Sequence, residues 1–172
     1  LDGKPVVVAF GPQYFYAESD RTAFRSVFGT GARCVPLTYR LGTVAAGAFP
    51  LPPMWLSGGG VLTPEALHQY LDDFYGSAAT WPSTVGGVFP GFHDIYEEAG
   101  VRSSYGFLDP QNGETLRHPL ELALAQNPDI VQLVTWNDYG EGTTIEPTVE
   151  YGYQYLETVQ ETRRSLDPKF TA

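Results

Sequence analysis

The sequence reads DIVQLVTWNDYGEGT over residues 129–143, and this stretch is the strongest indication of an α/β fold. Residues 129–134 are mostly β-branched or aliphatic, which predicts a short parallel strand that is buried on both faces. Polar residues follow this strand directly, and α/β folds build their functional sites at the carboxyl ends of such strands. Asp138 and Glu141 stand three positions apart in the next loop, and glycines flank Glu141. The loop is therefore either a catalytic loop with paired carboxylates or an ordinary acidic surface loop.

Strand and helix patterns alternate along the rest of the chain. Residues 39–60 are predicted to be irregular, and residues 105–116 to form a hairpin-like turn with an Asn-Gly pair at its tip. Four consecutive βα units imply a parallel sheet, whereas a complete (β/α)₈ barrel takes roughly 200 residues or more. Residues 1–172 are therefore expected to form one α/β domain, either half of a TIM barrel within a larger protein or a small open α/β domain. The other strands are predicted at 5–10, 34–37 and 84–89, and the helices at 18–28, 63–75, 119–125 and 149–166.

Composition and charge exclude several kinds of partner. The net charge of −10 argues against nucleic acid and anionic lipid, since both are bound by clustered Lys and Arg. No apolar run approaches the roughly 20 residues of a membrane span. No His, Cys or acidic spacing typical of a metal site occurs, nor a nucleotide-binding glycine motif, so neither a metal nor another cofactor is expected. Cys34 is the single cysteine; it cannot form an internal disulfide and is expected to be buried.

Paired carboxylates suit glycoside cleavage, in which one carboxyl protonates the leaving oxygen and the other assists attack at the sugar carbon. Aromatic residues make up 14% of the chain, and their flat rings can stack on sugars. Each such side chain also has a structural interpretation, as a packing residue, a loop anchor or a helix cap. The candidates for substrate binding are Gln13 and Tyr14 after the first strand, Trp55 in the irregular stretch, His93 and Asp94 after the third strand, and Trp136, Asn137, Tyr139 and Glu146 in or near the acidic loop.

The acidic loop also resembles known enzyme families. Residues 135–141, Thr-Trp-Asn-Asp-Tyr-Gly-Glu, resemble a signature of glycoside hydrolase family 71, the α-1,3-glucanases or mutanases. Residues 142–147, Gly-Thr-Thr-Ile-Glu-Pro, look like family 99, the endo-α-mannosidases and mannanases. The stretches 2–6 and 89–92 are similar to this group as well. Because both families fold as (β/α)₈ barrels, the resemblance implies that this chain is the C-terminal half of one.

The resemblance implies roles for the two carboxylates. Asp138 and Glu141 would be the catalytic pair, with Glu141 as general acid and Asp138 as general base acting through water, as in an inverting family 71 enzyme. Family 99 has Glu at the position of Asp138, where the carboxylate assists attack by the sugar's own 2-hydroxyl. The general acid must stay protonated near neutral pH, so the pKa of Glu141 is expected to be raised by burial or by a neighbouring carboxylate.

The expected activity is that of a secreted or cell-surface enzyme that cleaves α-linked polysaccharide, with endo-α-1,3-glucan as the first substrate. The alternatives are an endo-α-mannanase or mannosidase of the family 99 type, a non-catalytic carbohydrate-binding barrel relative, and an unrelated small α/β protein. Besides the polysaccharide, the expected partners are the missing N-terminal half-barrel or a second copy of the chain.

Overall fold

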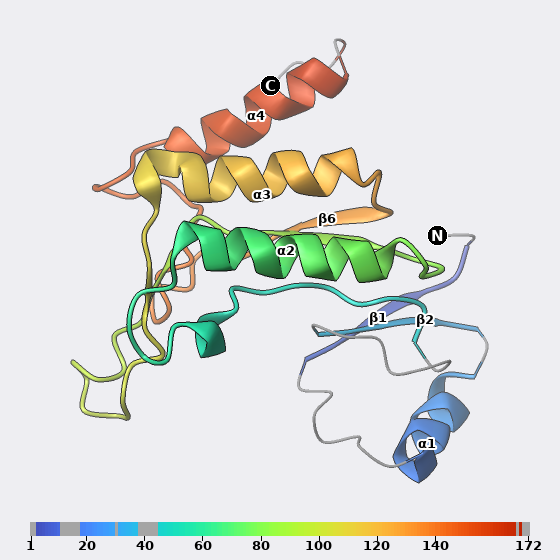
Figure 1. The fold of residues 1–172 in the computed structure, drawn as a ribbon. Coiled ribbons are helices and arrows are strands. Elements are labelled where there is room, and N and C mark those ends of the chain that lie inside the picture. Colours follow the sequence, from blue (N-terminus) through green and yellow to red (C-terminus); the bar gives the residue numbers. More distant parts are fainter. Residues whose placement is uncertain (1–2, 11–17, 30, 38–44, 168, 170–172) are drawn as a thin grey trace.

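The computed structural model describes residues 3–10, 18–29, 31–37, 45–167 and 169. Within these residues strands and helices alternate as the sequence predicted (Figure 1). The elements are, in order, β1 (Val6–Ala9), α1 (Glu18–Phe28), β2 (Arg33–Pro36), η2 (Met54–Leu56, a 3₁₀ turn), α2 (Pro64–Ala78), β3 (Val85–Val88), β4 (Phe92–His93), β5 (Phe107–Leu108), η3 (Gln111–Gly113, a 3₁₀ turn), α3 (Glu114–Ala125), β6 (Ile130–Leu133) and α4 (Gln154–Leu166).

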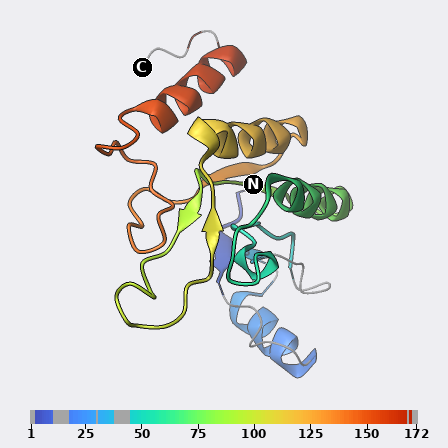
Figure 2. The ribbon, with the colours of Figure 1, turned by 60° about the vertical axis from the view of Figure 1, so that its left-hand side comes forward.

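The four-residue strands pair in parallel. β1 pairs with β2, and β3 pairs with β6. The loops that follow β3 and β6 lie at the same end of the molecule, on the left in Figure 1. At this end β4 and β5 form a short antiparallel pair, the two small arrows near the centre of Figure 2. Loops from two βα units therefore meet at the carboxyl ends of the strands, where α/β folds place their sites.

Residues 45–51 form an additional extended segment between β2 and β3, where the sequence predicted only irregular structure. The segment runs parallel to β2, and the N–H group of Phe49 donates to the Pro36 carbonyl at 3.0 Å. On its other side, a Cβ placed on Gly87 of β3 would lie 2.4 Å from the carbonyl oxygen of Pro50. The segment reads Ala-Ala-Gly-Ala-Phe-Pro-Leu. Its small residues lack the β-branched pattern of a strand and Pro50 removes a backbone donor, so the sequence did not indicate a strand here.

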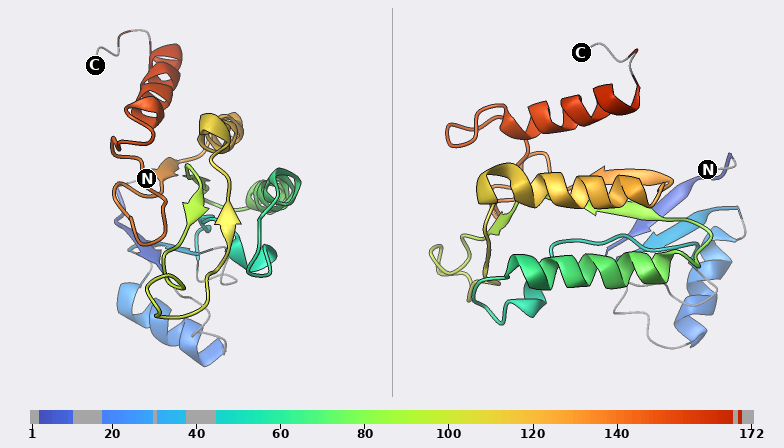
Figure 3. Two further views of the ribbon diagram at one scale, coloured as in Figure 1. Left: turned by 90° about the vertical axis from the view of Figure 1, so that its left-hand side faces the viewer. Right: turned by 45° about the horizontal axis from the view of Figure 1, so that its top comes forward.

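Helices α2 and α3 cover β3 and enclose the main core. They lie side by side on one face of the strands, and α4 lies beyond α3 (Figures 1 and 3). Gly86 lets α3 approach β3 closely, because a Cβ there would be 2.7 Å from the Ala123 methyl group. The fully buried aliphatic and aromatic residues of this core include Leu62, Leu71, Val88, Phe89, Leu108 and Leu116.

β6 is more exposed than its sequence predicted. All four residues of β3 are buried, whereas Ile130 and Leu133 at the two ends of β6 are exposed, Leu133 by 38%. Both strands are apolar, but β3 lies between β6 and the 45–51 segment, while in the described part of the chain β6 pairs with β3 alone. The prediction of a parallel strand is confirmed, and the prediction that both faces are buried is wrong.

The hairpin predicted over residues 105–116 does not form. β5 pairs with β4 instead, and α3 begins at Glu114, directly after the Asn112-Gly113 pair and before the predicted start at 119. Both residues of the pair have positive φ, 52° and 96°, a conformation that Asn and Gly adopt readily. This tight turn leads into a helix rather than into a second strand, and Pro119 lies inside that helix.

The remaining helices agree with the prediction apart from their bounds. Thr63 is the N-cap of α2, and its hydroxyl accepts from the Ala66 N–H at 3.2 Å, as the sequence indicated. α4 begins at Gln154 instead of 149, because a turn bridged between Thr148 and Gly152 precedes it. None of the described helices has both the length and the apolar character to span a bilayer.

Candidate active site

The acidic loop that follows β6 is closed at its neck by backbone hydrogen bonds. The N–H of Thr135 donates to the carbonyl of Thr143 at 2.7 Å, and the N–H of Glu146 donates to the carbonyl of Trp136 at 2.9 Å. The two threonine hydroxyls are 2.9 Å apart and share a further hydrogen bond. Ile145, just past the neck, is buried in the main core. The loop over 137–142 is therefore held at both ends by the body of the fold.

Asp138 sets the conformation inside the loop. Its N–H donates to the Thr135 hydroxyl at 3.1 Å, and its Oδ1 accepts from the Glu141 N–H at 3.0 Å. A carboxylate that accepts from a backbone N–H three residues later closes a tight turn. The three-residue spacing in the sequence thus brings the Asp138 carboxylate next to the backbone of Glu141.

β4 holds the same loop from the other side. The N–H of His93 donates to the Glu141 carbonyl at 2.9 Å, and the N–H of Ile95 donates to the Gly140 carbonyl at 3.1 Å. Gly142 has a φ of +65°, and a Cβ there would lie 2.9 Å from the carbonyl oxygen of His93. Glycine is therefore required at this position for both its backbone conformation and its close contact with β4.

The Glu141 carboxyl is half-buried and points toward the loop after β4. Its Oε1 accepts a hydrogen bond from the Tyr96 hydroxyl at 3.0 Å. Burial raises the pKa of Glu141, and the negative charges of Asp138 and Asp94 raise it further, while the Tyr96 hydrogen bond and the Arg102 charge oppose the rise. The net direction is upward, which confirms the expectation for this carboxyl and favours its protonated form.

The exposed side of the loop carries aromatic and polar side chains. Trp136 is 54% exposed, and Asn137 and Tyr139 are also exposed. The Tyr139 hydroxyl donates to Oε1 of Glu146, which ties the tip of the loop to the segment after its neck. These four predicted residues therefore lie together on the loop or directly beside it.

The two candidates after β3 differ in what their side chains do. His93 is exposed, and its ring packs edge-on against Phe107 with centroids 5.4 Å apart. Asp94 is only 3% exposed, and its two carboxylate oxygens accept from the N–H groups of Tyr96 and Tyr105 at 3.3 and 2.6 Å. Asp94 therefore fixes the loop after β4.

Trp55 lies on η2, a segment attached to the same loop. Its exposed ring packs edge-on against Tyr70 of α2. The hydroxyl of Ser57, two residues later, donates to the Tyr105 carbonyl at 2.8 Å. Gln13 and Tyr14, the candidates predicted after the first strand, lie outside the described residues.

Three residues close to Glu141 were not among those predicted from the sequence, namely Tyr96, Arg102 and Tyr105. The Arg102 guanidinium carbon lies 4.0 Å from the ring centre of Tyr96 and 3.4 Å from that of Tyr105. These residues precede Glu141 by about 40 positions in the chain and follow no recognisable spacing. The sequence signal that could have found them is their position, shortly after the third predicted strand and the Phe-Pro-Gly-Phe-His-Asp stretch at 89–94.

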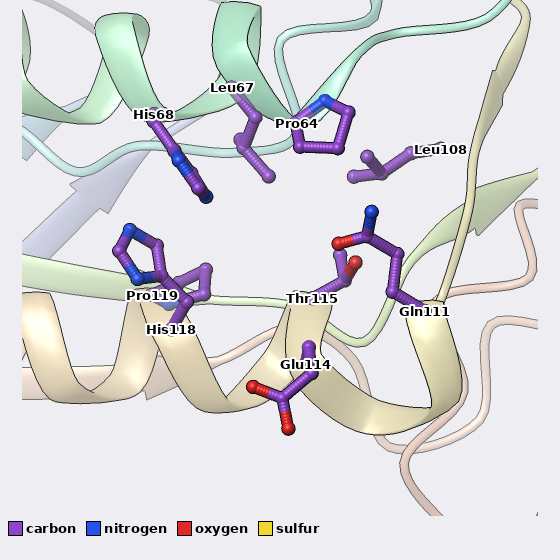
Figure 4. Close-up of a pocket in the computed structure, with 9 residues that line it drawn as sticks. All are labelled: Pro64, Leu67, His68, Leu108, Gln111, Glu114, Thr115, His118 and Pro119. Carbon is purple, nitrogen blue, oxygen red and sulfur yellow. The ribbon is translucent and has the colours of Figure 1, made fainter.

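Other parts of the molecule hold hollows that share no residue with the acidic loop. A pocket of about 160 Å³ lies between α2 and α3, and the rings of His68 and His118 face each other across it with centroids 3.9 Å apart (Figure 4). A larger hollow of about 280 Å³ lies between α3, β6 and α4. Across the described ranges, no three His, Cys, Asp or Glu side chains converge in a way that could hold a metal ion.

No protein-family model and no curated protein matches the sequence. Solved structures do resemble the fold. An endo-α-mannosidase of glycoside hydrolase family 99 from Bacteroides thetaiotaomicron, in complex with bis-tris-propane, aligns over 98% of this chain and 60% of its own, with a TM-score of 0.65 and 16% identity. Another structure of such an enzyme from this organism aligns over 96% and 57% of the two chains, with a TM-score of 0.65 and 17% identity.

A glycoside hydrolase-like protein aligns over 94% of this chain and 54% of its own, with a TM-score of 0.56 and 16% identity. The chain thus spans less than two thirds of the length of each of these structures. At this level of identity the similarity establishes a shared fold, and the chain has a fold distantly similar to that of glycoside hydrolases. The resemblance to family 71 stays a prediction.

Proposed function

We propose that the chain is the site-bearing half of a glycoside hydrolase that cleaves α-linked polysaccharide. The observation that carries the proposal is the environment of Glu141, a half-buried carboxyl beside Asp138 at the carboxyl end of a parallel strand. A raised pKa is what a general acid needs near neutral pH.

In this mechanism Glu141, in its protonated form, donates its proton to the glycosidic oxygen as the bond to the sugar carbon breaks. Asp138 accepts a proton from the water that attacks the same carbon. One Asp138 oxygen accepts from the Glu141 N–H, so the other oxygen serves as the base. The exposed Trp136 ring and the Tyr139–Glu146 pair line the solvent side of the loop, where they would contact the sugar.

The same proposal includes the architecture of a half-barrel. It is supported by the parallel order of the strands, the helices that cover one face, and the likeness to family 99 enzymes over 54–60% of the similar chains. The strands that would complete the barrel come from additional polypeptide or from a second copy of the chain. They would pair with the free edges of β1 and β6.

The proposed substrate is one of two α-glycans, α-1,3-glucan or α-mannan. The Asp at position 138 follows the family 71 signature and favours α-1,3-glucan, whereas the fold is similar to that of enzymes that act as endo-α-mannosidases. The two polysaccharides therefore belong in one experiment.

The test is release of reducing sugar from α-1,3-glucan and from α-mannan by the protein that carries this chain, compared with its Glu141→Gln variant. We expect hydrolysis of one polysaccharide and a loss of roughly 10²–10⁴-fold in kcat for the variant, the usual contribution of a general acid. Glu121→Gln, on the exposed side of α3, is the matched control. Binding of either glycan without hydrolysis would overturn the catalytic proposal and favour a carbohydrate-binding barrel.

A further inference from the structure

The loop between β4 and β5 contains a cluster that the proposed mechanism does not use. We call Tyr96, Arg102 and Tyr105 the tyrosine–arginine cluster. The two rings lie nearly perpendicular with centroids 6.0 Å apart, and the guanidinium lies over both of them, 4.0 and 3.4 Å from their centres. A guanidinium at such distances is attracted to each ring face, so the cluster holds its three side chains together.

Asp94 holds the backbone beneath this cluster. Its oxygens accept from the N–H groups of Tyr96 and Tyr105, which are nine residues apart in the chain. Asp94 is almost completely buried, and both of its oxygens are used in these contacts. The loop between the two tyrosines is therefore closed at its base by a carboxylate and at its top by a guanidinium.

The cluster contacts the candidate active site through the hydroxyl oxygen of Tyr96. The Tyr96 hydroxyl donates to Oε1 of Glu141 at 3.0 Å, and within the described residues no hydrogen bond reaches Oε2 of this carboxyl. A hydroxyl donor at Oε1 favours the acid proton on Oε2, because the oxygen that accepts the hydrogen bond is the more negative one. The hydrogen bond thus distinguishes the two oxygens of the carboxyl.

We propose that Tyr96 is the positioning residue for Glu141 and that it leaves Oε2 as the oxygen that carries the acid proton. Arg102 acts on Glu141 by holding Tyr96, in addition to the effect of its charge. The inference rests on the proposed role of Glu141 and adds a device that orients its carboxyl. The charged groups that bear on this carboxyl are Asp138 from its own loop and Asp94 and Arg102 from the loop after β4.

The first test is the titration of Glu141 in the whole protein. The ¹³C resonance of its side-chain carboxyl is recorded as a function of pH, and this resonance is assigned by its absence in Glu141→Gln. Tyr96→Phe removes one hydroxyl and keeps the ring, so we expect the pKa of Glu141 to rise further. Tyr105→Phe is the matched control: its hydroxyl has no hydrogen bond within the described residues, and we expect no change. An unchanged titration in Tyr96→Phe would overturn the inference.

The second test separates Arg102 acting through Tyr96 from Arg102 acting by its charge alone. Arg102→Met is expected to raise the pKa of Glu141, and in the Tyr96→Phe background the same change is expected to add much less. Equal effects in the two backgrounds would show direct electrostatics and overturn the role of Arg102. Circular dichroism of each variant verifies the fold, and Arg102→Met tests the cluster independently of Tyr96.

Kinetics distinguish this inference from the proposed function. Tyr96→Phe should lower kcat by about 10- to 100-fold, the value of a hydrogen bond to a charged group, and should move the alkaline limb of the pH profile to higher pH. A purely structural role would lower the rate without moving that limb. If Glu141→Gln keeps full activity, the proposed function fails. If Glu141→Gln is inactive and Tyr96→Phe keeps the native pH profile, only the positioning inference fails.

Discussion

β3 and β6 are neighbours in one parallel ladder, yet they differ in how the fold supports them. β3 is buried along its whole length between β6 and the 45–51 segment, whereas both ends of β6 are exposed. The two sequences are comparably apolar, so the difference comes from the number of neighbours and not from composition. An apolar strand with a free edge is a place where another strand can add.

The helices repeat this difference. α2 and α3, which precede and follow β3 in the chain, meet at the His68 and His118 rings, which lie tilted against each other beside a small pocket (Figure 4). α3 and α4, on either side of β6, leave a larger hollow lined mainly by aliphatic side chains, among them Leu120, Leu124, Val131, Leu133 and Val159. The β3 side of the molecule is closed, and the β6 side is open.

The candidate site follows the open strand. Its loop therefore depends on local supports: the neck bonds at Thr135 and Thr143, the backbone contacts with β4, and the Tyr96 hydroxyl. The acidic loop is therefore positioned by hydrogen bonds across its own neck and by contacts from the segment that follows β3.

The largest expected difference between the two strands is in stability. Gly87→Ala on β3 would place a Cβ against the Pro50 carbonyl and ring, and we expect it to lower the free energy of unfolding by about 1–3 kcal/mol. Gln132→Ala, directly opposite on β6, is expected to change it by less than about 0.5 kcal/mol. Urea denaturation measures both, and equal losses would contradict the contrast between a closed and an open strand.

In the described part of the chain β1 pairs with β2 alone and β6 with β3 alone, which predicts self-association of the 172-residue chain on its own. Val8 of β1 is 55% exposed and Leu133 of β6 is exposed as well, so we expect oligomers in light scattering. Leu133→Lys should weaken association by about tenfold or more, since burial of a Leu side chain is worth about 1.5–3 kcal/mol. Val149→Lys, in an exposed loop away from β6, is the control. A monodisperse monomer of the unmodified chain would refute this prediction.

A smaller effect concerns stability and the Glu141 charge. The folded state raises the pKa of this carboxyl, so its contribution to stability is complete below the ordinary Glu pKa of about 4.3 and is lost as the pH rises through the folded-state value. Glu141→Gln should therefore have a higher Tm than the native chain at pH 7 and the same Tm at acidic pH. A lower Tm at pH 7 would mean that the Glu141 charge stabilises the fold.

The smallest expected effect concerns the contact between α2 and α3. Burial lowers the pKa of His68, and the neighbouring His118 lowers it further, while Asp72 and Glu65 oppose the change. The neutral form of His68 is favoured in the folded state. The contribution of this group to the free energy of unfolding is therefore complete above about pH 6.5 and falls as the pH drops below this value. His68→Gln should reduce the fall in Tm between pH 7 and 5. An unchanged fall in His68→Gln would contradict the prediction.

Sequence patterns predicted most of the elements but not all of their neighbours. The four main helices, the parallel strands and the Thr63 cap follow from periodicity and local chemistry. The extended segment at 45–51 was missed because it consists mostly of small residues and contains a proline, so it lacks a strand pattern. The Asn112-Gly113 turn was assigned to a hairpin because the same local conformation also precedes helices.

The residues of the candidate site also fall into those that the sequence predicts and those that it does not. Asp138 and Glu141 could be predicted because they share one loop, and a single hydrogen bond across three residues fixes their relation. Tyr96 could not, since its contact with Glu141 joins positions 45 residues apart. Asp94 was predicted as a sugar partner, and the structure shows both of its oxygens occupied by backbone N–H groups.

The alternation of strands and helices and the two carboxylates on one glycine-flanked loop can be predicted from the amino-acid sequence, because they depend on hydrogen bonds and side-chain periodicity within a few residues. Three further features become visible in the folded chain alone: within the described residues one edge of β6 has no partner strand, Tyr96 contacts Glu141, and Arg102 lies over two tyrosine rings. Such contacts depend on how distant segments pack, and the burial that raises the pKa of Glu141 exists only after they have packed.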